Sequence, residues 1–468
     1  MKFICKPIYF VNTLRVIWAL FLLYNEFFIY KFAAHQCAIR QRYEQAVTKG
    51  RFIFIGDPQI TDDHSYNRPW IIMQLTKFYS SIYMKRNYKH IKSALQPTDI
   101  VMMGDLMDNG RDWNDETYKL EVERFHTIFP QDSSVDVHYM VGNHDIGFGS
   151  GIEEHWIKRF SQYFGPTSYI FQKYGYTFIV LDTISLGSDD PSIRQEAEEV
   201  LRQQSVLKDK NKILLTHVPL FRTDECGPYR QSKDKTIRQG RGYQYQNLLT
   251  EEMSDYLLKE IDPVLIFSGD DHDYCKIIHN GYNRSVEFTV PTFSMAQGLK
   301  YPGFVTLNMV KNETLAPTTA KQLTTHLCWL PNQVDIFINY AYLLIITLFI
   351  LIIWSFVFNR KRFRRNYFVA DNMSLPIYRT FYPPFMSSSS SVLQSNSTYD
   401  KPLFHGRTSE YQHQEKNSSL ASASASHIST SFSPATSSFF YSVKVFVYTI
   451  KDIAWVSFIV YILCILIL

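Results

Sequence analysis

The segment Val137-His-Tyr-Met-Val-Gly-Asn-His-Asp145 places a short apolar run directly before a glycine and three polar residues. Its first five residues have the length and the residue types of a β-strand. Asn143, His144 and Asp145 then offer an amide, an imidazole and a carboxylate, which are groups that bind divalent metal ions in proteins. The segment therefore predicts a strand that delivers polar side chains to the edge of a sheet.

The same pattern, an apolar run followed by a residue that can bind a metal, occurs four more times before residue 310. It is found at Phe52–Ile55 with Asp57, Ile100–Met103 with Asp105, Ile213–Leu215 with His217, and Val264–Phe267 with Asp270. Helix-like stretches such as 116–129 and 192–208 lie between the runs, and this alternation predicts an α/β fold. Because open α/β sheets place their sites at the carboxyl ends of strands, we expect the polar residues to converge on one cleft.

Seven residues of these segments form a candidate metal-binding set: Asp57, Gln59, Asp105, Asn143, His217, Asp270 and His272. Carboxylate, imidazole and amide ligands without a thiolate suit Mn²⁺, Fe or Zn²⁺. A carboxylate can bridge two ions roughly 3.5–4 Å apart, and such a pair can activate water and clamp a phosphate. One such element alone is usually a turn, but five in order predict a two-metal site that cleaves phosphoesters.

Five ordered motifs in this region resemble those of the calcineurin-like metallophosphoesterase superfamily. They are Gly56-Asp-Pro-Gln59, Gly104-Asp-Leu-Met-Asp108, Gly142-Asn-His-Asp145, Thr216-His217 and Gly269-Asp-Asp-His272. The resemblance covers residues 51 to about 310. It implies a four-layer α/β/β/α sandwich, in which two sheets are flanked by helices.

The resemblance also implies a role for the residues of the motifs. The first metal would be held by Asp57, Gln59, Asp105 and His272. The second would share Asp105 and be completed by Asn143, His217 and Asp270. His144 would face the substrate phosphate as an acid or as a stabiliser of the transition state, and Asp145 would orient it. Asp108 would either support the ligands from behind or lie in a surface turn.

Two positions depart from the commonest pattern of the superfamily. Gln59 stands where a histidine is usual, and Asp270 stands where the last motif usually has its first histidine. Both changes make the site richer in oxygen, which favours Mn²⁺ over Zn²⁺. They also leave open a site that binds metal weakly or is inactive.

A narrower resemblance concerns the segments 226–230, 240–247 and 268–275. They resemble the endoplasmic-reticulum phosphoesterases that remodel GPI anchors, including the fungal members of that group. The resemblance implies removal of ethanolamine phosphate from a mannose of the GPI glycan, which promotes export of GPI-anchored proteins. Two alternatives stay open: a catalytically inactive glycan-binding or cargo-export adaptor of the same fold, and a phosphoesterase acting on another lipid or nucleotide diester.

The loop from Phe221 to Asn247 carries six Lys or Arg against three acidic residues. Candidate contacts to a diester or glycan in this loop are Arg222, Arg230, Arg241 and Tyr243. A solvated surface loop explains each of these residues equally well. The net charge of the whole chain is only +4, so nothing in it argues for nucleic acid as a partner.

Three apolar stretches are candidate membrane segments. Residues 16–34 are predicted as an uncleaved signal-anchor, because no small-residue cleavage site follows closely and Glu26 is unusual in a signal peptide. Residues 336–358 contain no charge and are long enough to cross a hydrocarbon core of roughly 30 Å. Residues 439–468 are predicted as an amphipathic segment with a terminal span, and a membrane-surface hairpin or a removed anchoring tail are the alternatives.

Basic residues after the middle stretch predict the orientation. Five Lys or Arg lie between Arg360 and Arg365, which places that end in the cytosol by the positive-inside rule. Residues 1–15 and 359–438 are then cytosolic, and residues 44–330 form a domain in the lumen of the endoplasmic reticulum. The Ser-rich part of 359–438 has few aliphatic residues and is predicted to be disordered.

Four cysteines, Cys37, Cys226, Cys275 and Cys328, fall in the predicted luminal part, where the compartment is oxidising. Cys37 and Cys328 both lie next to a predicted span. We therefore favour Cys37–Cys328 with Cys226–Cys275 among the three possible pairings, and four buried thiols are the alternative. The triplets that begin at Asn283 and Asn312 are glycosylation sequences on the same side.

Overall fold

The structure is a computed structural model, and it describes residues 7–42, 48–207, 211–242, 244–280, 284–310, 323–358 and 434–466. The chain divides into two compact units. The larger unit comprises Arg15–Ile345 and Ala454–Leu468, and the smaller one comprises Met1–Leu14 and Ile346–Ile453. The larger unit contains every β-strand of the described residues.

The first sheet has the strand order β13-β12-β1-β2-β3. Neighbouring strands among β1, β2 and β3 are parallel, whereas β12 is antiparallel to both β1 and β13. The strands are β1 (Thr48–Ile55), β2 (Asp99–Met102), β3 (Asp136–Tyr139), β12 (Gly303–Val310) and β13 (Leu323–Trp329). The three parallel strands are those predicted before Asp57, Asp105 and Asn143, so these residues leave the same edge of the sheet.

The second sheet has the strand order β10-β11-β9-β6-β5-β4. Its inner strands β11, β9, β6 and β5 are parallel, and the edge strands β10 and β4 are antiparallel to their neighbours. The strands are β4 (Tyr169–Lys173), β5 (Tyr176–Leu181), β6 (Lys212–Thr216), β9 (Leu265–Ser268), β10 (Cys275–His279) and β11 (Ser285–Thr289). A separate two-stranded ribbon consists of β7 (Arg241–Gly242) and β8 (Tyr245–Gln246).

Alternation along β1 shows how the two sheets pack. Successive side chains of a strand point to opposite faces. Phe54 stacks on Phe267 of β9, with ring centroids 3.9 Å apart, and Phe52 stacks on Phe178 of β5 at 4.6 Å. Both phenylalanines therefore lie between the sheets, whereas the alternating Ile53 belongs to the core that the first sheet forms with helices.

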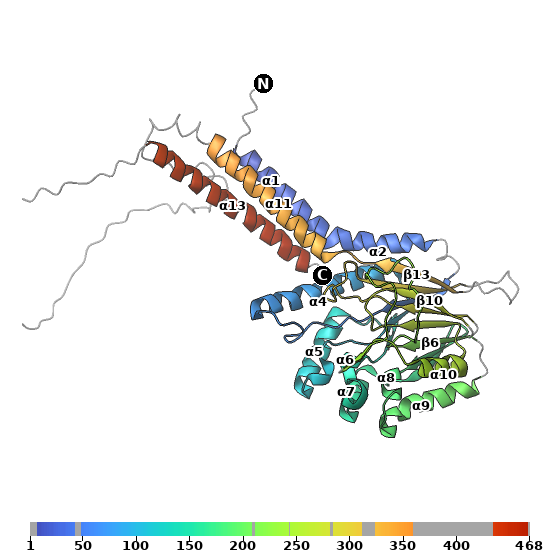
Figure 1. Cartoon of the computed structure of the whole chain (residues 1–468). Helices are drawn as coiled ribbons and strands as arrows, with labels where there is room; N and C mark the ends of the chain where they lie inside the picture. Colours follow the sequence, from blue (N-terminus) through green and yellow to red (C-terminus); the bar gives the residue numbers. More distant parts are fainter. Residues whose placement is uncertain are drawn as a thin grey trace, which may run out of the picture. The chain divides into compact units, whose positions relative to one another are not determined.

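Helices cover the outer faces of both sheets (Figure 1). α4 and α5 pack on the first sheet, and α9 and α10 pack on the second. The helices of the domain are α4 (Trp70–Leu95), α5 (Asp115–Ile128), α6 (Asn143–Ile146), α7 (Glu154–Phe164), α8 (Thr183–Leu186), α9 (Pro191–Val206) and α10 (Glu251–Ile261). The predicted four-layer α/β/β/α sandwich is confirmed.

Three helices of the described residues are long and apolar enough to cross a membrane: Ile8–Arg40, Gln333–Phe356 and Phe439–Leu466. Their elements are α1 (Pro7–Leu23), a π-helical stretch (Tyr24–Phe28), α2 (Ile29–Arg40), α11 (Gln333–Ile353), a second π-helical stretch (Trp354–Phe358) and α13 (Pro434–Leu466). These helices contain most of the predicted segments 16–34, 336–358 and 439–468. Of the segment predicted to be disordered, residues 359–433 lie outside the described residues.

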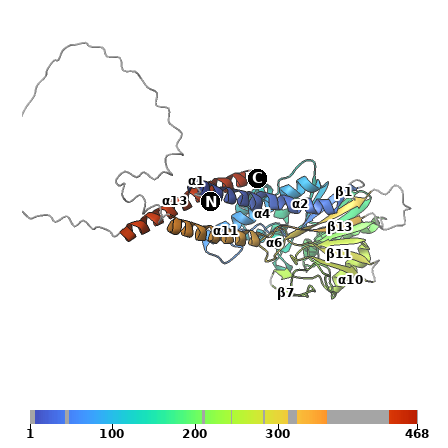
Figure 2. The same cartoon turned by 90° about the horizontal axis from the view of Figure 1, so that it is seen from above.

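Two disulfides confirm the favoured cysteine pairing. Cys37 in α2 is bonded to Cys328 in β13, and Cys226 is bonded to Cys275 in β10. The first bond links α2 to β13, an edge strand of the first sheet. Both views show α2 close to β13 (Figure 1 and Figure 2). The second bond ties the loop from 221 to 247 to the strand that follows His272. Asn283 and Asn312 lie outside the described residues.

Candidate active site

Tight backbone turns bring the predicted metal ligands together. Left-handed backbone, with φ between 33° and 65°, is found at Asp57, Gln59, Asp105, Asp270 and His272. Such conformations cost of order 1–3 kcal/mol each in L-residues and gather at functional sites. The approach is too close for a side chain at Gly142, where an added Cβ would lie 2.1 Å from Asp105 Oδ1. The strand ends therefore converge as the sequence predicts.

One half of the site contains Asp57, Gln59, Asp105 and His272. Ligand atoms of Asp57, Asp105 and His272 all lie within 4.8 Å of one another. The Gln59 amide lies 2.8 Å from Asp105 Oδ2, so its side chain reaches the same point. These four residues are the ones that the sequence assigned to the first metal.

The other half is arranged around His217. Its Nε2 lies 3.3 Å from Asn143 Oδ1, 3.4 Å from Asp105 Oδ1 and 3.7 Å from Asp270 Oδ1. Its Nδ1 lies 2.8 Å from the carbonyl oxygen of Met103, which fixes the orientation of the ring. Asp105 is therefore close to both halves, which is the position required of a carboxylate that bridges two metals.

The chemistry of these side chains fits divalent cations. Burial raises the pKa of Asp57, and raises that of Asp270 to about 7, since ionised carboxylates are costly away from water and repel one another. The Oδ2 atom of Asp57 is buried and has no hydrogen-bond partner among the described residues. Cations held among Asp57, Asp105 and Asp270 would satisfy that oxygen and offset the repulsion.

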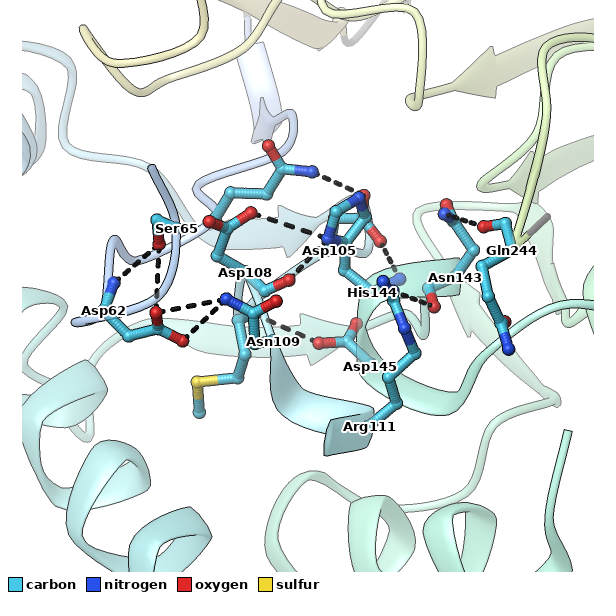
Figure 3. A network of polar contacts seen from close by, with 12 residues as sticks. Asp62, Ser65, Asp105, Asp108, Asn109, Arg111, Asn143, His144, Asp145 and Gln244 are labelled. Atoms are coloured by element: carbon cyan, nitrogen blue, oxygen red, sulfur yellow. Dashed lines mark hydrogen bonds and ion pairs between the residues drawn. The ribbon is translucent and has the colours of Figure 1, made fainter. Parts of the chain in front are cut away.

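His144 lies beside Asp105 and Asp108 (Figure 3). Its backbone N–H donates to Asp105 Oδ1 at 2.9 Å, and its Nε2 is 4.0 Å from Asp105 Oδ2. Its Nδ1 contacts the backbone oxygen of Asp108 and lies 3.5 Å from the Asp108 carboxylate. Burial acts to lower the pKa of His144, but Asp105 and Asp108 more than reverse this and raise it. The imidazole is 29% exposed, so it can reach a ligand.

The Asp145 carboxylate bonds to backbone groups, and the acidic side chains near the His144 imidazole among the described residues are Asp105 and Asp108. The Asp145 carboxylate accepts hydrogen bonds from the backbone N–H groups of Gly142 at 2.9 Å, Met107 at 3.2 Å and Leu106 at 3.3 Å. Asp145 therefore fastens the loop after β3 to the loop after β2. Asp108 contacts the imidazole of His144. Of the two roles considered for Asp108, this favours support of the site over a position in a surface turn.

Several polar residues around the centre had no signal in the sequence. The Asn143 amide donates to the backbone oxygen of Gln244 at 2.9 Å, and Arg111 donates to the backbone oxygen of Asn143 at 3.0 Å. Asn109 donates to both carboxylate oxygens of Asp62 behind Asp108 (Figure 3). These partners are 32 to 101 residues apart in the chain, so no local spacing identifies them.

The four predicted substrate contacts fall in different surroundings. Arg230 forms an ion pair with Asp271, the neighbour of Asp270, and Arg241 is exposed over the Phe148 ring at 5.9 Å. Tyr243 lies outside the described residues. Arg222 is 1% exposed and paired with the buried Glu287. Because its guanidinium is occupied inside the domain, we leave Arg222 out of the candidate substrate contacts.

A cavity of about 800 Å³ lies beside the last motif. Its charged lining residues are Arg230, Lys233, Asp234, Arg238, Asp271 and Lys300. Four of these are basic and two are acidic; Arg230 is paired with Asp271 and Arg238 with Asp234, so the positive charge of the lining remains on Lys233 and Lys300. We call this cavity the basic groove, and its position next to Asp270 connects it to the candidate metal centre.

The two-sheet sandwich and its centre define a metal-dependent phosphoester hydrolase. Residues 50–274 match the family model described as calcineurin-like phosphoesterase. The chain belongs to this family.

Named relatives match well beyond these residues. Cell division control protein 1 of Saccharomyces cerevisiae is 34% identical over 343 residues, which cover 69% of this chain and 70% of that protein. Metallophosphoesterase 1 of Cricetulus griseus is 26% identical over 349 residues, covering 68% of this chain and 83% of that protein. Metallophosphoesterase 1 of Gallus gallus is 25% identical over 372 residues, covering 72% and 86%.

Proposed function

We propose that this chain is a membrane-bound phosphodiesterase that removes ethanolamine phosphate from a mannose of GPI anchors in the endoplasmic reticulum. Its domain then faces the lumen, and its activity promotes export of GPI-anchored proteins. The observation that carries the proposal is the basic groove beside a centre in which ligand atoms of Asp57, Asp105 and His272 lie within 4.8 Å of one another. The resemblance of segments 226–230, 240–247 and 268–275 to GPI-remodelling phosphoesterases supports this choice of substrate.

The centre is proposed to hold two divalent ions. One is assigned to Asp57, Gln59, Asp105 and His272, and the other to Asp105, Asn143, His217 and Asp270. When bound, the ions activate water and offset the negative charge of the phosphate. The oxygen-rich set favours Mn²⁺.

His144 is proposed as the acid that protonates the leaving oxygen of the mannose. Its Nδ1 is held by Asp108, so Nε2 is the nitrogen available for a proton transfer. Asp105 and Asp108 raise the pKa of His144, which favours the protonated ring before the transfer. Asp145 contributes by fixing the two loops that carry Asp105 and His144.

The basic groove is proposed to bind the anionic glycan. The guanidinium of Arg230 is engaged by Asp271 and by the backbone oxygen of Asp234, so Arg230 is proposed to shape the wall of the groove, whereas Lys233 and Lys300 are proposed to contact the ligand. Arg241 extends from β7 near the loop after His144, and we keep it and Tyr243 as proposed contacts. Guanidinium groups suit a diester because they can donate two parallel hydrogen bonds to it.

The proposed compartment agrees with the cysteines. Two disulfides form in the larger unit, and disulfides persist in oxidising compartments such as the lumen of the endoplasmic reticulum. Three candidate spans agree with a multi-pass membrane protein. Cargo-export receptors are proposed as partners that would act on the product.

The test uses the full chain in lipid nanodiscs. We expect about two metal ions per chain, and Mn²⁺-stimulated release of ethanolamine phosphate from a synthetic GPI glycan. Asp105→Asn is expected to lose both, while Asp136→Asn, an exposed aspartate on β3, keeps both. Cleavage of bis-(p-nitrophenyl) phosphate without cleavage of the glycan would indicate another diester. A chain that binds the glycan but holds no metal and cleaves neither compound would be an adaptor.

A further inference from the structure

The N-terminal half of α4 exposes a set of large apolar side chains. Trp70 is 73% exposed, Ile71 64%, Ile72 47%, Leu75 47% and Phe78 44%. Residues 71, 75 and 78 have the i, i+4, i+7 spacing of one helix face. We call these five residues the α4 apolar face. A face of this size on a domain in water marks a surface that something covers.

The other half of α4 is buried in the domain. Tyr83, Met84, Tyr88, Ile91 and Leu95 belong to the core between this helix and the first sheet. One end of α4 accordingly extends away from the two sheets (Figure 1). The helix is therefore anchored by its second half, and its first half is presented outward.

The middle of α4 contacts the beginning of a candidate span. The Tyr79 ring lies 5.3 Å from the Phe337 ring in α11, and the Tyr83 hydroxyl donates to the backbone oxygen of Pro331 at 2.8 Å. α11 begins at Gln333, and residues 336–358 carry no charge, so the boundary between water and hydrocarbon falls near Phe337. The α4 apolar face ends at Phe78, next to Tyr79, and therefore lies close to the boundary between water and hydrocarbon.

The charges of α4 also suit a lipid surface. The helix contains no Asp or Glu, and its lysines are Lys77, Lys85, Lys89 and Lys92; Arg86 is buried against Glu26 and takes no part in this surface. Helices with tryptophan and aliphatic residues on one face and lysines elsewhere lie in the interface of a bilayer. Lysine stems can cover apolar surface while their ammonium groups stay at the level of the phosphates.

A hollow next to the α4 apolar face is lined by both apolar and basic side chains. It has a volume of about 340 Å³, and its lining includes Phe78, Ile82 and Ile128 together with Lys77, Lys85 and Arg124. Apolar and basic lining residues together suit a lipid with an acyl chain and an anionic phosphate, although Lys77 and Arg124 are also paired with Glu121. This observation is independent of the exposure of Trp70 and Leu75.

We infer that the α4 apolar face inserts into the surface of the bilayer on the domain's side of the membrane. The loop from Gln59 to Pro69 joins this face directly to the metal centre, and Tyr66 in that loop donates to the backbone oxygen of Ala296 at 2.8 Å. Lys300 of the basic groove, four residues after Ala296 in the chain, lies 4.0 Å from Asp335 in α11. If the proposed function holds, the face keeps the groove at the level where a lipid-anchored glycan leaves the membrane.

The test measures collisions of a spin label with oxygen and with a water-soluble nickel chelate. The full chain carries Cys5→Ser and Cys464→Ser, and is reconstituted in nanodiscs that contain phosphatidylcholine and phosphatidylserine. A label at Leu75→Cys is compared with one at Phe349→Cys, exposed in α11, and one at Leu120→Cys, exposed on α5 beside α4. No catalytic activity enters this measurement, so it is separate from the test of the proposed function.

We expect the label at position 75 to collide with oxygen as often as the label at position 349 does. Its collision rate with the nickel chelate is expected to be at least fivefold lower than that of the label at position 120. Nickel access equal to that at position 120 would overturn the inference. Protection from both reagents would also overturn it, and would point to a protein or a second copy on this face. A second measurement compares two rates, hydrolysis of a diester embedded in the bilayer and hydrolysis of a soluble diester. Leu75→Glu is expected to lower the ratio of the first rate to the second about tenfold, whereas Leu120→Glu leaves this ratio unchanged.

Discussion

Glu26 and Arg86 form an ion pair in which only 2% of either side chain is exposed. Glu26 lies in the π-helical stretch of the first candidate span, and Arg86 lies in α4 of the domain. The Tyr340 hydroxyl of α11 donates to the same carboxylate. One acidic side chain in an apolar segment thus joins two candidate spans to the domain.

Loss of this pair is expected to destabilise the chain strongly. Glu26→Gln leaves the Arg86 guanidinium buried without a counter-charge, which typically costs about 3–5 kcal/mol. Thermal unfolding of the full chain in detergent measures the effect. Glu154→Gln is the matched control, because its pair with Lys158 is exposed and is worth at most about 1 kcal/mol. Equal unfolding temperatures for the two variants would contradict the role of the buried pair.

Asp108→Asn is expected to lower kcat by roughly 10² while the metal content stays the same, since Asp108 supports the proposed acid rather than a metal. Removing the Asp108 charge also lowers the pKa of His144. The acid form is then lost at lower pH, so the alkaline limb of the pH–rate profile shifts to lower pH. A profile that keeps its alkaline limb would show that His144 does not act as this acid.

Asp145→Asn is expected to lower the stability of the fold rather than to shift the pH dependence of the reaction. An asparagine can replace only one of the two carboxylate oxygens that accept backbone N–H groups from Leu106, Met107 and Gly142. We expect a loss of about 1–3 kcal/mol in unfolding free energy. The pH–rate profile of the folded fraction is expected to keep its alkaline limb, which separates this variant from Asp108→Asn.

The choice of metal is expected to depend on Gln59 and Asp270. The double variant Gln59→His with Asp270→His replaces the oxygen atoms of two candidate ligands by imidazoles, which suit Zn²⁺. We expect the ratio of Zn²⁺ to Mn²⁺ affinity to rise at least tenfold, as measured by metal competition and mass spectrometry. An unchanged ratio would mean that these two side chains do not set the metal preference.

Glu287 is expected to make stability depend on acid pH. Burial opposes its ionisation, but Arg222 and His279 hold the pKa of Glu287 at about 2, below its ordinary value of 4.5. The stabilisation is complete above pH 4.5 and is lost as the pH falls towards 2. This amounts to roughly 3 kcal/mol at neutral pH. Denaturant unfolding of Glu287→Gln is expected to show that loss at pH 7, and a smaller difference from the unchanged chain at pH 3.

The convergence of the candidate metal ligands could be predicted because their positions depend on local sequence. Each follows an apolar run whose length and composition define a strand, and parallel strands end at one edge of a sheet. Asp57, Asp105, Asn143, His217 and Asp270 were found in this way. The partner of His144 could not be predicted, because Asp108 and Asp145 are both near it and only the course of the two loops separates them.

Contacts between residues that are distant in sequence could not be predicted. Arg222 lies in a basic loop, where charge alone suggested contact with a substrate. The structure places Glu287, 65 residues away, against its guanidinium. Gln244 orients Asn143 across 101 residues, and no motif connects them.

The sequence by itself determined the α/β class, the order of the five motifs and the apolar helices, since strand length and hydrophobic runs are local properties. The two-sheet sandwich was implied by the resemblance of the motifs to a family. Only the tertiary structure decided which side chain each ligand, acid and arginine contacts. Those contacts arise when separate strand ends, loops and helices meet in space. Their energies depend on burial and distance, which neighbouring residues in the chain do not specify.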